Sequence, residues 1–428
     1  MQKVVIIDGC RTPFLRSGTD YMDLLSYQLG GFAIKGLLTK TGIDPNLIDG
    51  VIMGNVISNV KTPNVAREAA LTAGVPNTTP CRTVSQACIS ANRAIADACL
   101  EIMTGQSDIV IAGGIDHTSD TPIQFPRKMR KKLFNAQRLK TMGDNLKFAT
   151  SLRPSDFIPE TPAVAEYTTN RVMGQDCDIM AARFEISREA QDEFAVRSHQ
   201  LAAKAHEEGH LPEEMVEVSL PPKFKVIDRD NGVRGDSTIE KVARLRPAFD
   251  KKFGTLTAAN SSFLTDGASA VLLMSEEKAK ELGFQAKAEV VDFVFTGQRL
   301  EDELLLGPAY ATSKLLKRQN LSFQDIDVIE FHEAFAGQIL SNLKALAFDE
   351  FAKENLDRNE AVGEVPMDRF NLWGGSLSIG HPFGATGGRL VTTTANRLIK
   401  ENGTYGILAA CAAGAHGHAM LLKRVIEK

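Results

Sequence analysis

Cys88 is the first residue whose setting favours chemistry. It lies in the stretch SQACISAN, which leads into a helix that we predict over residues 92–104. A cysteine at a helix N-terminus faces unpaired N–H groups and the positive end of the helix dipole, and both favour the nucleophilic thiolate. A small cysteine buried in the core also explains the motif. Cys88 alone therefore does not separate a nucleophile from a packing residue.

His381 occupies the glycine-rich stretch GGSLSIGHPFGATGGR, residues 374–389. Pro382 disfavours helical backbone at His381, and the glycines permit tight turns, so the next helix should begin near Gly387. A phosphate-binding loop is disfavoured because the stretch lacks Gly-Lys followed by Ser or Thr. An imidazole held on such a loop suits a general base near neutral pH. An incidental histidine in a structural turn is the alternative.

Cys411 lies in the stretch AACAAGAHGH, residues 409–418. We expect it to end a buried strand and to open a turn of small residues. Ligands gather at the carboxyl ends of strands in open α/β sheets, and successive N–H groups in such a turn can hold an anion. His416 and His418 have no third partner at metal-ligand spacing, so we predict no metal site.

His332 is found in the stretch EFHEAF, residues 330–335, where a strand should end and a helix should begin. At such a position His332 could donate a hydrogen bond to a developing oxyanion, and Glu333 could orient the groups around it. The alternative for Glu333 is an acid that only complements the dipole of the following helix.

Short β-branched runs alternate with longer helical patterns, which indicates an α/β protein with buried strands. The expected strands span residues 4–7, 51–54, 109–112, 270–274, 288–294, 328–330 and 406–410. The expected helices span residues 27–39, 92–104, 188–208, 310–318, 334–345 and 389–401. The two halves follow the same order of motifs, which suggests a duplicated unit; two unrelated α/β segments are the alternative. Residues from about 121 to 245 should form an inserted subdomain of loops and helices.

Composition excludes several classes of protein. The 428 residues include 49 Lys plus Arg against 53 Asp plus Glu, a net charge of −4, so nothing favours nucleic-acid binding. No apolar run reaches the roughly 20 residues of a membrane span, and the start MQKVVIID predicts a strand rather than a signal peptide. Six cysteines without a CxxC pair favour a reducing compartment. We expect the cytoplasm, or the mitochondrial matrix if the source is eukaryotic and a presequence has been removed.

Taken together, these motifs resemble those of the thiolases. The stretches ACISAN, GGSLSIGHPFGATG and CAAGAHGHAM occur there in this order and spacing, and the resemblance covers essentially the whole chain. The HEAF sequence, the CAAG turn and the RKMRKK insertion are most similar to the thiolase β subunits of trifunctional fatty-acid β-oxidation complexes. The resemblance implies a duplicated, five-layered αβαβα thiolase fold. Its N-terminal half would span 1–283, with the insertion at about 121–245, and its C-terminal half 284–428.

The resemblance also implies an activity, that of a 3-ketoacyl-CoA thiolase (acetyl-CoA C-acyltransferase). The thiolate of Cys88 would attack the 3-keto carbon of the substrate, with His381 as its base and Cys411 as acid and then base. His332, through a water, and His381 would stabilise one thioester oxyanion. The backbone N–H groups of Cys88 and Ala413 would stabilise the other.

Coenzyme A is the implied second substrate, and no permanently bound cofactor or metal is expected. Ser262 and Arg234 are the expected CoA contacts. The chain departs from the general thiolase pattern at His332, where many thiolases have asparagine, and at Ala413 and Ala415, which replace glycines. These changes affect an oxyanion hole and the geometry of a turn, but they remove no reacting group.

Two other functions remain open: a biosynthetic acetoacetyl-CoA thiolase, and a catalytically inactive scaffold subunit with the same fold. As partners we expect a second copy of the chain, in a homodimer or tetramer, and a hydratase–dehydrogenase α subunit. Apolar and basic residues alternate at helical spacing over residues 127–147. This segment is either a peripheral membrane contact or a solvated lid over the CoA phosphates.

Overall fold

The computed structural model describes residues 1–161 and 165–426. Its strands are β1 (Val4–Arg11), β2 (Leu15–Arg16), β3 (Gly50–Gly54), β4 (Cys81–Val84), β5 (Ile109–Asp116), β6 (Val218–Leu220), β7 (Lys225–Ile227), β8 (Thr265–Ser275), β9 (Ala288–Gly297), β10 (Val328–Phe331), β11 (Tyr405–Ala412) and β12 (His416–Arg424). Its α-helices are α1 (Ser26–Thr41), α2 (Val65–Ala73), α3 (Ser90–Met103), α4 (Arg127–Ala136), α5 (Met142–Ser151), α6 (Met173–Arg183), α7 (Arg188–Glu207), α8 (His210–Glu214), α9 (Ile239–Val242), α10 (Glu276–Glu281), α11 (Gly307–Gln319), α12 (Ala336–Ala347), α13 (Asp349–Asn355), α14 (Ser376–Ile379) and α15 (Thr386–Lys400). No helix in the described ranges is long and apolar enough to cross a membrane.

The two halves of the chain repeat one pattern of four strands. Their order is β3-β5-β8-β1 in the first half and β10-β11-β12-β9 in the second. In each set the first two strands run parallel and every later pair is antiparallel. A short antiparallel contact between β1 and β9 joins the two sets into one continuous sheet. The expected duplication is therefore confirmed, and the alternative of two unrelated segments is wrong.

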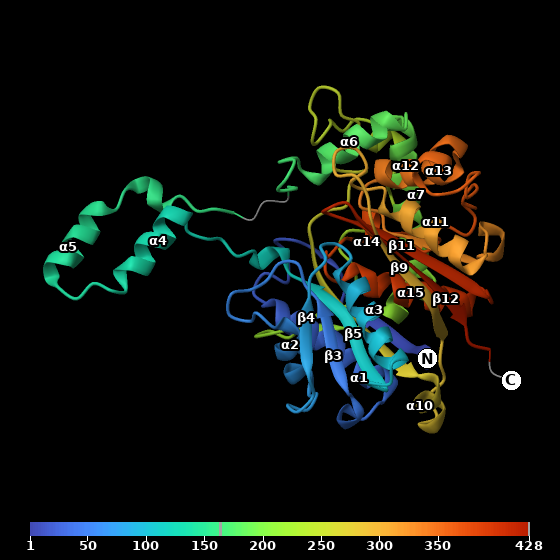
Figure 1. Cartoon of the computed structure of the whole chain (residues 1–428), viewed down its shortest axis with the longest axis horizontal. Helices are drawn as coiled ribbons and strands as arrows, with labels where there is room; N and C mark the ends of the chain where they lie inside the picture. The colour runs from blue at the N-terminus through green and yellow to red at the C-terminus, as the bar shows by residue number, and fades with distance from the viewer. Residues whose placement is uncertain (162–164, 427–428) are drawn as a thin grey trace.

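Alternation of side chains along the strands builds the layers (Figure 1). On β8, Leu272 packs outward with α1 and α2, whereas Leu273 packs inward with α3 and α15. On β11, Leu408 faces the same inner cluster, and Ile407 packs outward with α11 and α12. Since successive residues of a strand point to opposite faces, three apolar clusters alternate with two half-sheets. This arrangement is the five-layered αβαβα fold, with α3 and α15 in the middle layer.

The expected strands and helices are all present, and most are longer than the sequence pattern indicates. Three strands of the main sheet, the two-residue β2 and the longer β4 and β12, are absent from the expectations. β4 is a short, polar strand at the edge of the sheet, and β12 begins with the polar stretch His416–His418. β4 lacks the apolar run on which strand prediction depends, whereas β12 contains one, at residues 419–422, behind its polar start. α15 begins at Thr386, close to the expected start.

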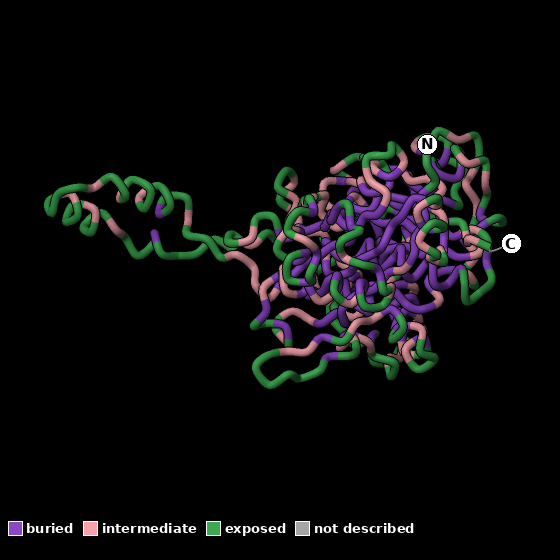
Figure 2. Tube along the Cα trace, turned by 90° about the horizontal axis from the view of Figure 1, so that it is seen from below, coloured by how far each residue is buried: buried purple, intermediate pink, exposed green. Residues whose placement is uncertain are grey.

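The insertion between β5 and β8 has two parts. The helices α6 and α7 pack on the second half, where α6 contacts α12 and α7 contacts α12 and α14. The helices α4 and α5 instead form a hairpin, here called the arm (residues 123–160), which projects away from the body (Figure 1). Most of its residues are exposed (Figure 2).

Candidate active site

One cavity of about 400 Å³ brings together most of the predicted site. Cys88, His381 and Cys411 line it, and they come from the loop before α3, the loop between α14 and α15, and β11. Ser262 and Ala413 line the same cavity. The remaining wall is mainly apolar and includes Phe249, Phe263, Leu305, Phe335 and Phe383. Two thiols and an imidazole therefore share a site whose walls are mainly apolar.

A second cavity, of about 450 Å³, meets the first at Cys88. It extends toward Val56, Ile57 and Pro122, so its far wall is also largely apolar. None of the described residues of α4 or α5 lines either cavity. The expectation that the basic insertion forms a lid over bound CoA is therefore wrong, because the arm extends away from this site.

The loop before α3 holds Cys88 in a strained turn. Ala87 adopts the left-handed conformation with φ 46°, which is unfavourable for a residue with a Cβ. The Ser90 hydroxyl stabilises the turn by donating to the Ala87 carbonyl at 2.7 Å and accepting the Gln86 N–H at 2.8 Å. The nucleophile thus lies at the turn itself, and its helix begins two residues later.

Burial raises the pKa of the Cys88 thiol to about 12, although the N–H groups of Ala413 and Cys88 itself, which hydrogen-bond to the sulfur, oppose this rise. Burial of the sulfur therefore opposes the helix end, which favours the thiolate. Cys88 needs a base before it can attack. Both N–H groups lie beside the reacting sulfur, so they are near the place where the carbonyl oxygen of an attacked substrate would become an oxyanion.

The turn after Cys411 carries one of these N–H groups. Its Gly414 N–H donates to Glu166 Oε2 at 2.8 Å, so a carboxylate from the insertion already occupies part of the expected anion-holding turn. Ala415 completes the turn in the left-handed conformation, with φ 54°. Sequence reasoning missed Glu166, which stands in no recognisable motif.

His381 is fixed from both sides of its loop. Its backbone N–H donates to Thr265 Oγ1 at 2.9 Å, and its Nδ1 lies 2.6 Å from Thr386 Oγ1. Its Nε2 has no hydrogen-bond partner in the described part of the chain. Burial and the nearby Arg389 lower the pKa of His381 to about 3, so the ring is neutral and can accept a proton.

His332 lies behind His381 rather than on the cavity wall, with the two ring centroids 4.0 Å apart. Its Nδ1 lies 2.9 Å from Ser376 Oγ, and its Nε2 has no partner among the described residues. Burial, followed by His381 and Arg389, lowers the pKa of His332 well below the usual range. His332 is therefore a neutral, fully buried group that stands next to His381 but does not itself line the cavity.

Cys411 differs from Cys88 in its surroundings. It is buried on β11, and its pKa is raised above the ordinary value by burial and then by the neighbouring Cys88. The thiol is therefore protonated at rest, as an acid must be before it gives up a proton. The two thiols stand in one site but on different elements, so their environments can separate their roles.

Asp116, at the end of β5, ties the loop that follows β3 to the His381 loop. Its carboxylate accepts the N–H groups of Val56 at 3.1 Å and Ile57 at 2.8 Å, and also that of Gly384 in the His381 loop. The His381 loop approaches β5 so closely that a Cβ on Gly114 would lie 1.7 Å from the Gly384 carbonyl oxygen. Burial raises the pKa of Asp116 to about 7. Its place at the end of a buried strand was the signal that sequence reasoning overlooked.

Two other predicted residues lie away from the reacting atoms. Arg234 is exposed, lines neither cavity, and donates to the Asn231 and Val233 carbonyl oxygens at 3.2 Å. Glu333 is buried outside the cavity and accepts from Ser198 Oγ at 2.7 Å and Asn371 Nδ2 at 2.8 Å. It therefore helps to anchor the segment that leads into α14. Within residues 1–161 and 165–426, no three metal-ligating side chains cluster.

Known proteins with the same organisation identify the family. The family models for the thiolase N-terminal and C-terminal domains match residues 4–277 and 284–424. The human mitochondrial trifunctional enzyme subunit beta is 51% identical to this chain, and the match covers 99% of this chain and 89% of the human one. A probable 3-ketoacyl-CoA thiolase of Caenorhabditis elegans is 48% identical, and the match covers 99% of this chain and 94% of the nematode one. The crystal structure of the Bacillus anthracis acetyl-CoA acetyltransferase is 31% identical and covers 99% of both chains with a TM-score of 0.85. The chain therefore belongs to the thiolase family.

Proposed function

We propose that this chain cleaves 3-ketoacyl-CoA with coenzyme A, yielding acetyl-CoA and a shortened acyl-CoA. The observation that carries the proposal is the meeting of Cys88, His381 and Cys411 at one apolar cavity. A human relative is named as the β subunit of the trifunctional enzyme and a nematode relative as a probable 3-ketoacyl-CoA thiolase. The same reaction, acyl transfer through a cysteine, fits the residue types present.

The first half-reaction begins at Cys88. Its thiol proton moves to Nε2 of the neutral His381, and the sulfur attacks the 3-keto carbon of the substrate. The bond between C2 and C3 then breaks, so the acyl group stays on Cys88 and the electron pair remains on C2 of the departing acetyl-CoA. Cys411 supplies the proton that C2 takes up, which its raised pKa allows.

The second half-reaction reverses these proton transfers. The Cys411 thiolate removes the proton from the thiol of an incoming CoA, whose sulfur attacks the acyl thioester. The sulfur of Cys88 leaves and recovers its proton from His381. We assign the N–H groups of Cys88 and Ala413 to the oxyanion on the acyl carbon, and His381 with His332 to the oxyanion of the acetyl thioester.

Two cavities at Cys88 favour a substrate longer than acetoacetyl-CoA. We assign the pantetheine arm of CoA to the cavity that Ser262 lines and the acyl tail to the cavity near Val56 and Ile57. Arg234 is retained as a contact for the far end of CoA, at the protein surface. A structural relative, the human mitochondrial 3-ketoacyl-CoA thiolase, has been crystallised with CoA. In this assignment CoA is a substrate and nothing is permanently bound.

A chain-length series of thiolysis assays tests the substrate. We expect kcat/KM to rise from acetoacetyl-CoA to longer 3-ketoacyl-CoA, because each buried methylene contributes about 0.8 kcal/mol. Ile57→Trp should fill the second cavity and abolish the preference for long chains, while C4 turnover persists. Strict preference of the wild type for C4 would instead establish the biosynthetic acetoacetyl-CoA thiolase. If the protein cleaved no 3-ketoacyl-CoA of any length, the result would favour a catalytically inactive scaffold subunit.

We further propose that the smallest assembly is a homodimer, and that a tetramer or a complex with an α subunit forms from such dimers. We place the protein in a reducing compartment. The half-exposed edge strand β4 offers unpaired backbone groups to a second copy. The reducing compartment, cytoplasm or mitochondrial matrix, follows from the need for free Cys88. We also propose the domain boundaries: an N-terminal half of residues 1–283, which contains the insertion at about 121–245, and a C-terminal half of residues 284–428. Sedimentation of the chain alone, and with a hydratase–dehydrogenase subunit added, measures these assemblies.

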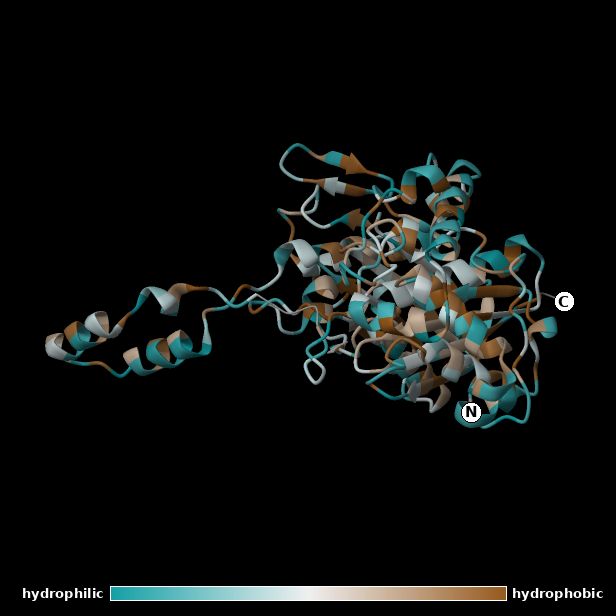
Figure 3. Ribbon diagram, turned by 90° about the horizontal axis from the view of Figure 1, so that it is seen from above, coloured by the Kyte–Doolittle hydropathy of each residue, from teal (hydrophilic) through white to brown (hydrophobic). Residues whose placement is uncertain are grey.

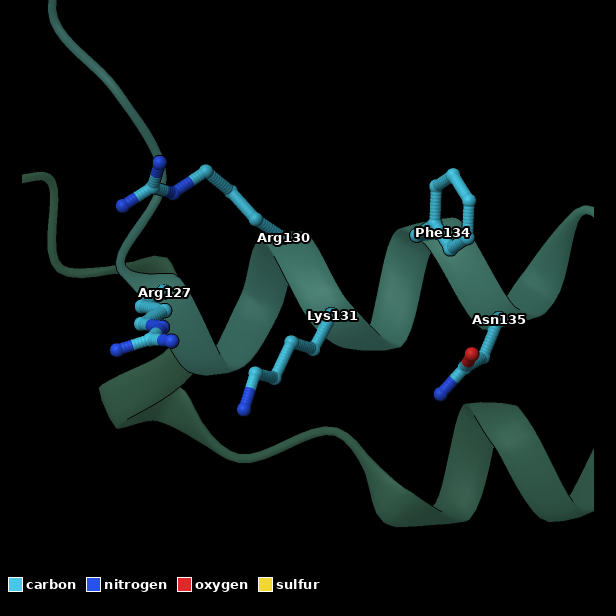
Figure 4. Close-up of a pocket in the computed structure, with 5 residues that line it drawn as sticks. All are labelled: Arg127, Arg130, Lys131, Phe134 and Asn135. Carbon is cyan, nitrogen blue, oxygen red and sulfur yellow. The ribbon is translucent and has the colours of Figure 1, made fainter.

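The arm is the surface that we assign to a membrane contact through residues 127–147. On α4, Arg127, Arg130 and Lys131 lie on the turns before Phe134, and the Phe134 side chain is 60% exposed (Figure 4). Apolar and polar stretches alternate along the arm, and Met142 at its far end is 88% exposed (Figure 3). Basic side chains beside exposed apolar ones bind the interface of an anionic bilayer.

Co-sedimentation with vesicles tests this contact. We expect binding to phosphatidylcholine vesicles that contain phosphatidylglycerol, and at least about tenfold weaker binding of Lys128→Glu/Lys131→Glu, because each basic residue near an anionic surface contributes about 1 kcal/mol. Lys61→Glu, an exposed charge on the body, is the matched control. Equal binding of wild type and the double variant would remove the membrane role from the arm.

A further inference from the structure

His332 and His381 are neighbouring neutral histidines that are held in different ways. The Nδ1 of His332 contacts the Ser376 hydroxyl at 2.9 Å, and the Nδ1 of His381 contacts the Thr386 hydroxyl at 2.6 Å. Neither Nε2 has a hydrogen-bond partner in the described ranges. A neutral imidazole carries one proton, so the nitrogen that holds it decides whether the free Nε2 donates or accepts.

Hydrogen-bond accounting at Ser376 fixes the proton of His332. Arg389 is completely buried, and its Nη2 lies 3.1 Å from Ser376 Oγ. A guanidinium only donates, so the Ser376 oxygen accepts there and its single hydrogen needs another acceptor. The Nδ1 of His332 is the one acceptor that the described contacts of this hydroxyl provide. If Nδ1 accepts, the ring proton is on Nε2.

The opposite arrangement holds at His381. Thr386 Oγ1 donates its hydrogen to the Pro382 carbonyl at 3.0 Å, as hydroxyls in the first turn of a helix commonly do. The same oxygen can then only accept from His381, whose proton therefore lies on Nδ1. The Nε2 of His381 is left with a free lone pair, as a base requires.

We propose that Ser376, oriented by Arg389, is a positioning residue that holds His332 as the Nε2–H tautomer, so that His332 donates to the thioester oxyanion while His381 stays a base. The proposal rests on the proposed thiolase function. Two rings only 4.0 Å apart thus take different roles: His332 offers a donor to the thioester oxygen, and His381 offers an acceptor to the Cys88 thiol. A lone pair on His332 Nε2 would instead repel the developing negative charge.

Removal of the Ser376 hydroxyl tests the proposal. We expect Ser376→Ala to lower kcat on the order of tenfold with little change in KM, because the donor tautomer of His332 is no longer selected. Ser376→Thr keeps the hydroxyl and should recover most of kcat. Ser378→Ala is the matched control, because that hydroxyl contacts Ser198 and the Gly375 carbonyl but neither histidine.

A second background separates positioning from packing. In His332→Asn the side-chain amide has a permanent donor, so Ser376→Ala should there change kcat by less than about twofold. An equal loss of kcat in both backgrounds would show that Ser376 acts only through the fold and would overturn the proposal.

The tautomer itself can be measured in the unmodified protein. With 15N-labelled histidine, the His332 shifts, assigned by their loss in His332→Asn, should show a bare Nδ1 and a protonated Nε2, and those of His381 the reverse. A protonated Nδ1 on His332 would overturn the proposal whether or not any variant folds. This measurement needs no turnover, so its result does not depend on the thiolase function. The thiolase function is tested separately, and it would be overturned if the wild type did not cleave any 3-ketoacyl-CoA.

Discussion

The helices α3 and α15 occupy matching places in the two halves but have different surroundings. α3 follows the Cys88 loop and keeps one side in solvent, where Arg93 pairs with Asp97 at 2.8 Å and Leu100 is 46% exposed. α15 follows the His381 loop and is buried along almost its whole length, including Arg389 and Arg397. The same strand order therefore supports one half-exposed helix and one that is enclosed.

The enclosed helix contributes charges that the exposed one does not need. Arg397 contacts Glu330 of β10 at 2.7 Å, just before His332, and Arg389 reaches Ser376 at 3.1 Å. The first half supplies a nucleophile from a loop, whereas the second supplies His332, His381 and Cys411 and the buried charges that orient them. Duplication thus conserved the framework of strands, while the chemistry is divided unequally between the halves.

The largest expected effect is at the single reacting side chain of the first half. We expect Cys88→Ala to lower kcat by more than about 10³-fold, because no acyl group can be held without the sulfur, while the circular dichroism spectrum stays unchanged. Cys99→Ala, a buried residue of α3, is the control; it should cost about 1 kcal/mol of stability and leave thiolysis intact. Normal thiolysis by Cys88→Ala would remove this residue from the mechanism.

The next effect concerns the charges that distinguish α15 from α3. Arg397→Met leaves Glu330 buried with only Arg389, at 3.7 Å, and should cost about 3–5 kcal/mol of unfolding free energy in urea denaturation. Burial already raises the pKa of Glu330 to about 7, so Glu330→Gln added to this variant should restore much of the loss. Arg93→Met on α3 breaks only an exposed pair and should cost about 0.5 kcal/mol or less. Similar costs for the two arginine variants would contradict the proposed difference between the helices.

β12 carries a fully buried histidine, His418, whereas its counterpart β8 has no histidine. Burial lowers the pKa of His418 to about 3, so between about pH 6.5 and 3 the unfolded chain binds a proton that the folded chain does not. Folding stability therefore falls with falling pH, by up to about 1.4 kcal/mol per pH unit from this group. His418→Leu should remove that part of the slope when denaturation curves are compared at pH 4 to 7. Parallel curves for the two proteins would show that His418 does not titrate in this way.

Much of this organisation could be predicted from the sequence. The repeated motif order indicated the duplication, and the surroundings of Cys88, His381 and Cys411 indicated reacting groups. Part of the support for these groups was not predictable: Glu166 and Ser376 act through contacts with residues more than 40 positions away, which no local pattern encodes. The net effect on the Cys88 pKa was also hidden, because the helix end is visible in a sequence but the depth of burial is not.

The smallest expected effect concerns two alanines near the reacting cysteines, one in each half. Ala87 before Cys88 and Ala415 after Cys411 both have left-handed backbone, with φ 46° and 54°. Left-handed backbone costs an alanine about 1 kcal/mol in the folded state, and a glycine avoids this cost. Part of that gain in stability is lost, because a glycine also has more conformational freedom in the unfolded chain. Ala415→Gly should therefore raise the unfolding free energy by about 0.5 kcal/mol in urea denaturation and leave kcat unchanged, because Glu166 still holds Gly414. Ala87→Gly should gain similar stability but lower kcat, because the turn that aims Cys88 becomes looser. If both variants changed kcat equally, catalysis would depend on the exact backbone of the turn after Cys411 as much as on that of the turn before Cys88. The functional difference between the two halves would then not extend to these loops.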